Sequence, residues 1–293
     1  MQKLVALILA GGSGTRLYPI STPEKPKQFL ELASEELSLF QQCLERAQAC
    51  PSVTNLAVIT NYRHRYLADY QLRKLWRAYE SAHIILETAS KNTAPAITYA
   101  SLLYPDATLL VLPSDHWISS QNSFNEHVQI ALDYAMNGKI VLFGIKPSSP
   151  HSGYGYIQKG QALSDDAYQI ASFKEKPDEF NAREYIKDGY LWNSGMFCFK
   201  SEVFRAEISK YSPKIYEACK KALHNSVLDL NLVTNLPIPE PESFLDCPSM
   251  SIDYAVMEKT EKAAVIESVF GWSDLGNWEM LNTLRSKLGL ANI

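Results

Sequence analysis

The stretch LVALILAGGSGTRLYPISTPEKPKQF, residues 4 to 29, is the most informative part of this chain. It opens with an unbroken aliphatic run, residues 4 to 10, which predicts a strand buried on both faces of a parallel sheet. Gly11, Gly12 and Gly14 follow at once, and glycines let a turn bring its backbone N–H groups close to an anion. The stretch therefore predicts a strand that ends in a phosphate-binding loop.

Two basic residues complete this loop. Arg16 offers a planar fork for phosphate oxygens, and Lys27 offers a compact charge from another side. A P-loop is excluded because no Lys-Ser/Thr pair follows Gly14, and a dinucleotide fingerprint is excluded because its third glycine would fall on Leu17. A purely structural turn would leave the placement of Arg16 and Lys27 unexplained, so the loop is interpreted as a polyphosphate site.

The stretch resembles the signature of the sugar-nucleotide pyrophosphorylases, and among them the mannose-1-phosphate guanylyltransferases, whose pattern is close to LAGGxGTRLWPLSR followed by PKQF. Seven further matches follow in the family's order: NTAPAI at 92–97, LPSDH at 112–116, GYGYI at 153–157, FKEKPD at 173–178, WNSGMF at 192–197, SIDYAVMEK at 251–259 and GWSDLGNW at 271–278. The resemblance implies a nucleotide-diphospho-sugar transferase fold. It also implies a Mg²⁺-dependent transfer of GMP from GTP to mannose 1-phosphate, which yields GDP-mannose and pyrophosphate.

Size and charge agree with small anionic substrates. The chain has 293 residues, of which 46% are hydrophobic and 20% charged, enough for a sizeable core. Its formal net charge of −4 provides no global basic field for nucleic acid or an anionic membrane, so an anion site must be local. We expect neither of those partners, and the sequence leaves a homodimer open.

Cysteine usage and hydropathy predict a cytoplasmic protein. The 5 cysteines form no CxxC pair and are odd in number, which indicates neither a zinc site nor a disulfide framework. The aliphatic run near the N-terminus is short for a signal peptide and lacks an Ala-x-Ala cleavage site. No apolar run approaches the roughly 18 residues of a membrane-spanning helix.

The order of apolar runs predicts an α/β fold. Strands are expected at 4–10, 56–60, 83–86, 108–113 and 140–145, with helices at 38–49, 62–78, 93–103 and 123–136. This alternation predicts a Rossmann-like, mostly parallel mixed sheet with helices on both faces, and ligands beyond the carboxyl ends of its strands.

We expect a single nucleotidyltransferase domain, residues 1–293, with a nucleotide-binding half (1–145) and a sugar-binding half (146–293) added to the same sheet. Shorter strands are predicted in GYGYIQKG, AYQIASFKEK and MFCFK, and helices at about 178–188 and 201–225. Residues 235–249 hold four prolines and are interpreted as a surface connection without regular helix. The chain stops soon after GWSDLGNW, so we expect no C-terminal β-helical or cupin domain.

Two aspartates are the candidate metal ligands. Asp115 and Asp274 are isolated carboxylates at the ends of predicted elements, and Mg²⁺ typically takes one or two carboxylates together with phosphate oxygens and water. Matching aspartates hold the metal in the family, so the resemblance assigns Mg²⁺ to them. Helix capping is the alternative role for each. His116 is interpreted as a packing or supporting residue rather than a ligand.

The sugar site is expected from the second half of the chain. Alternation along SFKEK leaves open whether Glu175 and Lys176 share a face. The resemblance assigns sugar hydroxyls to Glu175 and the sugar phosphate to Lys176, which joins Arg16 and Lys27 as a catalytic cation. Gly155 allows a close approach to a hexose in the resembling motif, although a bulge is the alternative. The amide of Asn193 suits vicinal hydroxyls, and Trp192 is assigned to the core.

The nucleotide site is expected at Gly11, Gly12, Gly14, Thr15, Glu87, Asn92 and Thr93. A carboxylate such as that of Glu87 can accept both the N1–H and N2–H donors of guanine.

Four residues depart from the family pattern: Tyr18, Thr22, Thr88 and Lys91 stand where Trp, Arg, Pro and Arg are usual. Two alternatives therefore stay open: a nucleotidyltransferase for another sugar 1-phosphate or base, and a non-catalytic nucleotide-sugar-binding regulatory subunit. Retention of the candidate metal-binding and basic residues argues against the second alternative.

Overall fold

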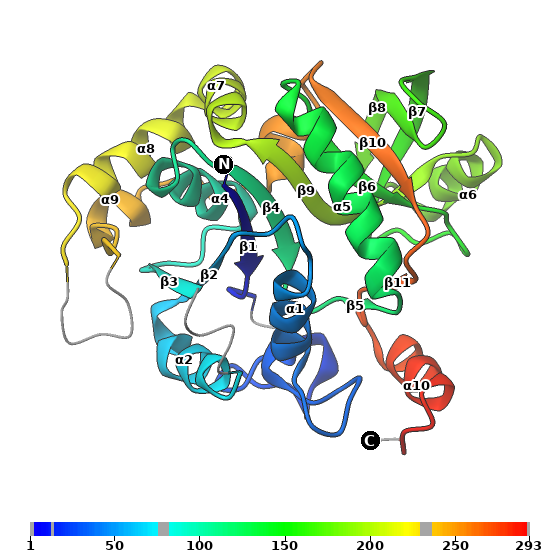
Figure 1. Cartoon of the computed structure of the whole chain (residues 1–293), viewed down its shortest axis with the longest axis horizontal. Helices are drawn as coiled ribbons and strands as arrows, with labels where there is room; N and C mark the ends of the chain where they lie inside the picture. The colour runs from blue at the N-terminus through cyan, green and yellow to red at the C-terminus, as the bar shows by residue number, and fades with distance from the viewer. Residues whose placement is uncertain (1–2, 13–14, 76–81, 229–235, 292–293) are drawn as a thin grey trace.

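The computed structural model describes residues 3–12, 15–75, 82–228 and 236–291 (Figure 1). The strands are β1 (Leu4–Leu9), β2 (Asn55–Asn61), β3 (Ala82–Glu87), β4 (Thr108–Pro113), β5 (Trp117–Ile118), β6 (Ile140–Ile145), β7 (Gly155–Ala162), β8 (Ala167–Glu175), β9 (Leu191–Lys200), β10 (Ala263–Ser268) and β11 (Trp272–Ser273). The α-helices are α1 (Leu39–Gln48), α2 (Arg65–Arg73), α4 (Thr93–Leu103), α5 (Gln121–Met136), α6 (Glu179–Lys187), α7 (Ser201–Tyr211), α8 (Pro213–His224), α9 (Pro241–Leu245) and α10 (Trp278–Lys287). Short helical turns are η1 (Thr15–Leu17), η2 (Lys27–Phe29), η3 (Tyr62–His64) and the π-helical η4 (Asp253–Met257).

One mixed sheet organises the described part of the chain, in the order β3-β2-β1-β4-β9-β6-β10-β8-β7. The β1, β2, β3 and β4 strands pair in parallel, as do β6 and β10. Strand β9 runs antiparallel to both β4 and β6, and β8 runs antiparallel to β10 and β7. All strands of this sheet except β8 and β9 therefore share one direction, which confirms the predicted mostly parallel mixed sheet.

Strands from the two expected halves are interleaved in this sheet. Strand β9, from the second half, separates β4 from β6, both from the first half. Strands β7 and β8, also from the second half, continue the same sheet at its far edge. The candidate nucleotide and sugar residues thus lie along one edge of a single hydrogen-bonded layer.

Alternation along β1 sends side chains to both faces of the sheet. Val5 and Leu7 join a cluster with residues of α4, α7 and α8, and Leu4, Ala6 and Ile8 join one with residues of α1, α2 and α5. Helices therefore cover both faces, as predicted (Figure 1). A strand with apolar side chains on both faces is stable only between two such helical layers.

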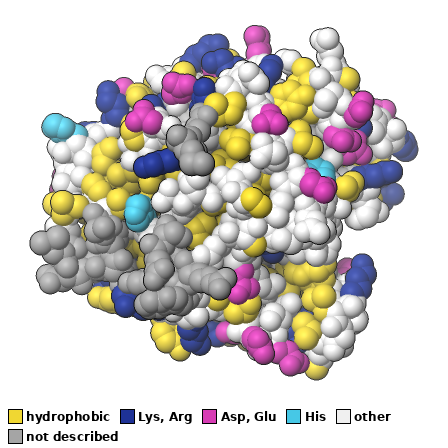
Figure 2. Space-filling view, viewed as in Figure 1, with side chains coloured by type: hydrophobic (Ala, Val, Ile, Leu, Met, Phe, Trp, Pro, Cys, Tyr) yellow, Lys and Arg dark blue, Asp and Glu magenta, His cyan; other side chains and the backbone are white. Residues whose placement is uncertain are grey.

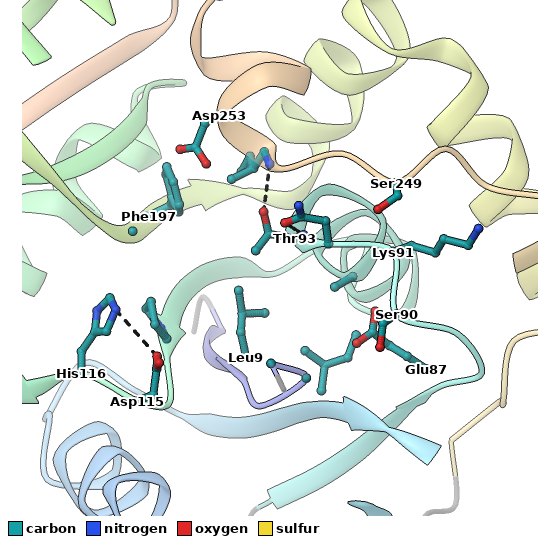
Figure 3. Close-up of a pocket in the computed structure, with 18 residues that line it drawn as sticks. Leu9, Glu87, Ser90, Lys91, Thr93, Asp115, His116, Phe197, Ser249 and Asp253 are labelled. Atoms are coloured by element: carbon teal, nitrogen blue, oxygen red, sulfur yellow. Dashed lines mark hydrogen bonds and ion pairs between the residues drawn. The ribbon is translucent and has the colours of Figure 1, made fainter. Parts of the chain in front are cut away.

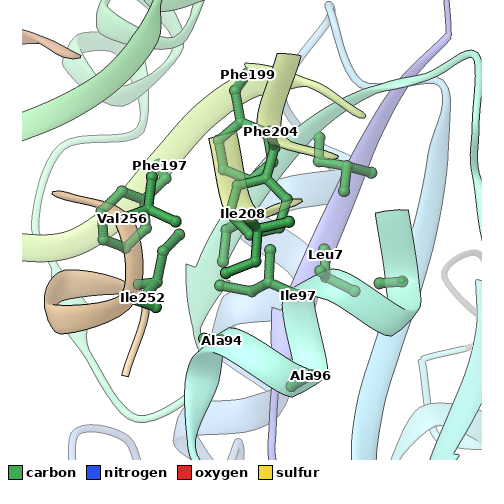
Figure 4. Packing of buried hydrophobic residues seen from close by; sticks show 14 of the residues in the cluster. Leu7, Ala94, Ala96, Ile97, Phe197, Phe199, Phe204, Ile208, Ile252 and Val256 are labelled. Carbon is green, nitrogen blue, oxygen red and sulfur yellow. The ribbon is translucent and has the colours of Figure 1, made fainter. Parts of the chain in front are cut away.

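The first of these clusters also reaches the second half of the chain. Figure 4 shows Ile97 of α4 beside Leu7 of β1, with Phe199, Phe204 and Ile208 packed above them. Phe199 and Phe204 stack with ring centroids 4.8 Å apart. This packing fixes α4, whose first residues belong to the candidate nucleotide site, against β9 and α7.

The predicted elements of the first half are present within a few residues, except that the expected 62–78 helix consists of the 3₁₀ turn η3 and of α2, which ends at Arg73. Positions 76–78 lie outside the described residues. One correction concerns residues 201–225, where the structure has two helices, α7 and α8, in place of one. Pro213 begins α8, because proline has no N–H for the helix and is tolerated in the first turn.

A second correction concerns the proline-rich connection. Residues 241–245 form the short helix α9, with Pro241 at its start and Glu240 accepting hydrogen bonds from the N–H groups of Glu242 and Ser243. Phe244 of this helix is fully buried and packs edge-on against Tyr99. The segment thus adds to the core instead of running only over the surface.

The surface carries interspersed charges of both signs on the face shown in Figure 2. This distribution agrees with the small net charge of −4 and leaves anion binding to a local site. No described helix is long and apolar enough to cross a membrane. The cysteines at 43, 50, 198, 219 and 247 are buried free thiols.

Candidate active site

The glycine loop follows the carboxyl end of β1, and side chains of other segments hold its backbone in place. The side-chain amide of Gln28 donates hydrogen bonds to the carbonyl oxygens of Ala10 (3.1 Å) and Gly12 (2.9 Å). The hydroxyl of Thr60 donates to the same Ala10 oxygen at 3.0 Å. These bonds fix the backbone before the loop. Gly14 lies outside the described residues.

A cavity of about 550 Å³ opens beside this loop. Its lining includes the candidate residues Gly11, Gly12, Glu87, Asn92, Thr93 and Asp115, together with Ser90, Lys91, His116, Gly195 and Asp253, which the sequence did not assign to ligand binding. Figure 3 shows Glu87 and Asp115 on opposite sides of Leu9, with Asp253 on the side of Phe197. The cavity thus spans the ends of β1, β3 and β4, where ligands of such sheets are expected.

Glu87 ends β3 and is buried, with 6% of its surface exposed. Its Oε1 atom has no hydrogen-bond partner among the described residues, and burial raises the pKa of the side chain to about 8. A Cβ atom on Gly11 would lie 2.8 Å from Oε2 of Glu87, so the glycine leaves room for this carboxyl group. An unpaired buried carboxyl group in a cavity is prepared for a ligand that donates hydrogen bonds.

Asn92 and Thr93 build the start of α4. Asn92 has a φ of 70° and a ψ of −174°, an extended conformation that is rare outside glycine, and its side chain accepts a hydrogen bond from the Thr93 N–H at 2.8 Å. The Thr93 hydroxyl accepts a hydrogen bond from the N–H of Ile252 at 2.9 Å, as drawn in Figure 3. These contacts join the start of α4 to the segment that leads into η4.

Lys27 brings the two candidate metal ligands to one place. Its buried ammonium nitrogen lies 2.7 Å from Oδ2 of Asp115 and donates a 2.6 Å hydrogen bond to the backbone oxygen of Asp274. Burial disfavours the charge of Asp115, but the Lys27 charge and His116 outweigh this effect and lower its pKa to about 2. Asp115 is therefore ionised at neutral pH and available to a cation.

The carboxylate of Asp274 is held by its own set of donors. The Tyr154 hydroxyl donates to its Oδ1 atom at 2.6 Å, and the Gly276 N–H donates to the same atom at 3.1 Å. Burial raises the pKa of Tyr154, and the charge of Asp274 raises it further, so the phenol remains a donor at neutral pH. Arg16, exposed in η1, lies near enough for its charge to oppose that shift.

These residues could hold a divalent metal ion. The described residues contain no group of three or more His, Cys, Asp or Glu side chains around one point, whereas Mg²⁺ needs only one or two carboxylates when substrate phosphates supply other oxygens. Asp115 and Asp274 are the carboxylates that would hold it. His116 accepts a hydrogen bond from the Trp272 indole at 3.2 Å, which supports the packing role expected for it.

The candidate sugar residues lie together at the ends of β7, β8 and β9. Gly155 pairs with Glu175 in the β7–β8 register, and a Cβ atom on Gly155 would lie 2.7 Å from Oε2 of Glu175 and 3.3 Å from Cβ of Asn193. Glycine is needed where these two side chains converge. Trp192, assigned to the core from the sequence, is buried.

Glu175 and Lys176 share a face because the strand ends between them. Strand β8 stops at Glu175, and Lys176 has a φ of 46°, a conformation that non-glycine residues rarely adopt and that concentrates at functional sites. The Lys176 ammonium consequently lies 2.5 Å from Oε1 of Glu175. Burial opposes the charge of Lys176, but this partner outweighs it and raises the pKa of the lysine.

Sequence reasoning missed Asp253. Asn193 donates a hydrogen bond to its Oδ1 atom at 2.9 Å, so Asp253 connects the cavity to the candidate sugar residues. Burial and the nearby Glu175 charge raise the pKa of Asp253 to about 7. Its motif, SIDYAVMEK, was matched in the sequence, but only the tertiary structure shows that its aspartate faces Asn193. Gln28 and Tyr154 were missed for the same reason.

A mostly parallel α/β sheet with a glycine loop, carboxylates and lysines at the carboxyl ends of its strands has the arrangement of nucleotide-binding folds. The chain belongs to the nucleotidyl transferase family, whose model matches residues 5–289.

Its curated relatives include the mannose-1-phosphate guanylyltransferase RfbM of Salmonella typhimurium strain LT2, 43% identical over 288 residues, or 96% of this chain and 58% of that protein. Another is the mannose-1-phosphate guanylyltransferase of Escherichia coli strain K12, 40% identical over 302 residues, or 99% of this chain and 62% of that protein. The chain thus spans about three fifths of the length of the curated relatives it matches.

Solved structures agree with this assignment. The crystal structure described as a mannose-1-phosphate geranyltransferase from Thermus thermophilus is 32% identical, with a TM-score of 0.82 over 97% of this chain and 80% of that one. A structure described as a mannose-6-phosphate isomerase from Helicobacter pylori is 30% identical, with a TM-score of 0.81 over 92% of this chain and 99% of that one. The fold is therefore that of the family.

Proposed function

We propose that this chain transfers GMP from GTP to mannose 1-phosphate, releasing pyrophosphate and forming GDP-mannose, with Mg²⁺ as the metal. The observation that carries the proposal is the cavity itself, which joins the unpaired carboxyl group of Glu87 to the Lys27–Asp115 pair past the glycine loop. A nucleotide with a donor-rich base and a chain of phosphates has complementary groups at both ends. The names of the relatives support guanine and mannose as the partners.

In this proposal Glu87 recognises the base through hydrogen bonds. Guanine presents N1–H and N2–H donors side by side, and a carboxylate accepts both. Hydrogen bonds to the charged form of a carboxylate lower its pKa, so guanine binding would offset the cost of ionising the buried Glu87. A uracil or thymine base lacks this donor pair and would leave the carboxyl group unsatisfied. Asn92 and Thr93 position the segment that borders the base.

The phosphates are proposed to lie between the glycine loop and the lysines. Gly11 and Gly12, with Gly14 and Thr15 as sequence-based members of the same loop, would approach the triphosphate, and Arg16 and Lys27 would neutralise it. Bound Mg²⁺ would supply charge stabilisation to the triphosphate and the departing pyrophosphate. Asp115 and Asp274 would hold that ion.

The sugar phosphate is proposed to lie against Lys176, with Glu175, Asn193 and Gly155 around the hexose. A phosphate monoester has a second pKa near 6, so its oxygen is already an anionic nucleophile at neutral pH and needs no general base. Attack of this oxygen on the α-phosphorus forms the new P–O bond as the bond to pyrophosphate breaks. The residues therefore act by positioning and by charge neutralisation.

The free cysteines support the reducing cytoplasm as the location of the protein.

The test is pyrophosphate release by the purified chain with GTP, ATP, UTP and dTTP, each paired with mannose, glucose and galactose 1-phosphates. We expect GTP with mannose 1-phosphate to give the highest kcat/KM, and Glu87→Gln to reduce the preference for GTP over UTP by about 100-fold, because a lost pair of directed hydrogen bonds typically costs a few kcal/mol. A higher kcat/KM for another pair would refute the specificity. Nucleotide binding without turnover of any pair would indicate the regulatory alternative.

A further inference from the structure

Tyr154 lies between the candidate metal ligand and the candidate sugar-phosphate lysine. Its hydroxyl donates a 2.6 Å hydrogen bond to Oδ1 of Asp274. Its backbone oxygen accepts a 3.1 Å hydrogen bond from the N–H of Lys176. One residue therefore contacts both sides of the proposed reaction, through two chemically separate groups.

The Tyr154 ring is fixed by aromatic neighbours. His151 stacks on it with centroids 4.0 Å apart and planes inclined by 15°. Trp192 and Trp272 meet it edge-on at 4.9 and 5.5 Å. Only 7% of the residue is exposed. Because these contacts surround the ring, its hydroxyl has little freedom to leave Asp274.

The hydrogen bonds to Asp274 fall on one oxygen. Tyr154 and the Gly276 N–H both donate to Oδ1, whereas no described residue donates to Oδ2. A Cβ atom on Gly276 would lie 2.6 Å from Oδ2, so the glycine keeps the space beside this oxygen open. Leu275, between them, has a φ of 48°, which shows that the backbone holds a rare conformation to bring these groups together.

We propose that Tyr154 is a positioning residue. Its hydroxyl holds Oδ1 of Asp274, which leaves Oδ2 free to hold a metal ion, and its backbone oxygen fixes the backbone of Lys176. This inference rests on the proposed function. Removing a contact that orients a metal ligand typically changes metal affinity by about 10- to 100-fold. The phenol acts on the metal side alone, because the contact with Lys176 comes from the backbone.

The test removes the Tyr154 hydroxyl and leaves the ring. Tyr154→Phe is compared with Tyr156→Phe, a matched control whose hydroxyl bonds to the backbone of His151 and has no contact with Asp274. Mn²⁺ binding to each protein with GTP, and no sugar phosphate, is measured by electron paramagnetic resonance. We expect Tyr154→Phe to weaken Mn²⁺ binding about 10-fold, and Tyr156→Phe to stay within about twofold of the unchanged protein.

Kinetics give a second readout. In Tyr154→Phe the Mg²⁺ concentration for half-maximal rate should rise, whereas KM for mannose 1-phosphate should not change, because the backbone contact to Lys176 remains. A rise in both constants together would indicate a general loss of structure and would overturn the positioning role. Thermal denaturation of both variants shows whether the fold is retained.

Asp274→Asn separates this inference from the proposed function. If Asp274→Asn weakens Mn²⁺ binding and Tyr154→Phe does not, the role of Tyr154 is wrong and the metal assignment stands. If Asp274→Asn also binds Mn²⁺ as the unchanged protein does, Asp274 is not a ligand, and both the metal assignment and the role of Tyr154 are wrong.

Discussion

The ammonium nitrogen of Lys27 lies 2.7 Å from Oδ2 of Asp115, and this ion pair forms the centre of the candidate site. The same nitrogen bonds to the backbone oxygen of Asp274, so it joins the PKQF, LPSDH and GWSDLGNW segments. A buried ammonium group is stable only when such partners replace its hydration. Lys27 therefore has a structural role in the site as well as the proposed role at the phosphates.

Replacing Lys27 by methionine tests this double role. We expect Lys27→Met to lower kcat about 100- to 1,000-fold, since loss of one directed charge at developing phosphate negative charge costs about this much. Without the lysine, burial would raise the pKa of Asp115. Pyrophosphate release at saturating substrates measures the effect.

Lys25→Met is the matched control, because Lys25 lies two positions earlier, is exposed, and pairs only loosely with Glu31 at 3.6 Å. It should retain nearly full activity. Equal losses in the two variants would contradict the specific role of Lys27.

The buried carboxyl group of Glu87 predicts a pH dependence of stability. Its pKa is raised from 4.5 to about 8 in the folded protein, so the folded state holds this proton more tightly than the unfolded chain does. The protonated Glu87 side chain makes its full contribution to the free energy of unfolding below about pH 4.5. That contribution is lost as the pH rises to about 8, because the unfolded chain releases the proton more easily than the folded protein does. Glu87→Gln, which stays neutral, should remove this loss.

Urea denaturation without nucleotide measures the difference. Between pH 5 and pH 8, the free energy of unfolding of Glu87→Gln should gain about 3 kcal/mol relative to the unchanged protein, because one pKa unit corresponds to about 1.4 kcal/mol. Glu31→Gln, at an exposed position, is the control and should show no such gain. Parallel pH curves for Glu87→Gln and the unchanged protein would refute the raised pKa.

Gly155 is expected to be irreplaceable on the sugar side. In Gly155→Ala the added methyl group would lie 2.7 Å from Oε2 of Glu175 and 2.9 Å from Cζ of Phe173, which is too close without movement of both. We expect KM for mannose 1-phosphate to rise about 10-fold or more, because displacements of about 1 Å in a site carry large costs. KM for GTP is the internal control and should change little. A selective effect on GTP would contradict the division of the site.

The hydroxyl of Thr93 predicts a coupling between α4 and η4. Thr93→Val removes the acceptor for the Ile252 N–H, and an unpaired buried donor costs about 1–3 kcal/mol. We expect a lower free energy of unfolding and weaker nucleotide binding, measured by urea denaturation and by calorimetry with GTP. Thr93→Ser keeps the hydroxyl and should recover most of both. Failure of serine to do so would show that the methyl group, not the hydrogen bond, matters.

Much of the fold could be predicted from local patterns. The apolar runs placed β1, β2, β3, β4 and β6 within about one residue, because a strand buried on both faces must be apolar throughout. The break between α7 and α8 at Pro213 was missed because amphipathic spacing continues across it. The burial of Phe244 in α9 was missed because it depends on packing against Tyr99, far along the chain.

Local sequence patterns establish which residue types stand at the strand ends: glycines after β1, Glu87 as the last residue of β3, and Asp115 just after β4. Chain geometry then requires them to meet at one edge of a parallel sheet. The partners that these residues contact are visible only in the folded structure. The bond of Tyr154 to Asp274, the bond of Asn193 to Asp253 and the position of Lys27 join segments that no local rule relates. Such contacts follow from strand order and packing, which are properties of the whole folded chain.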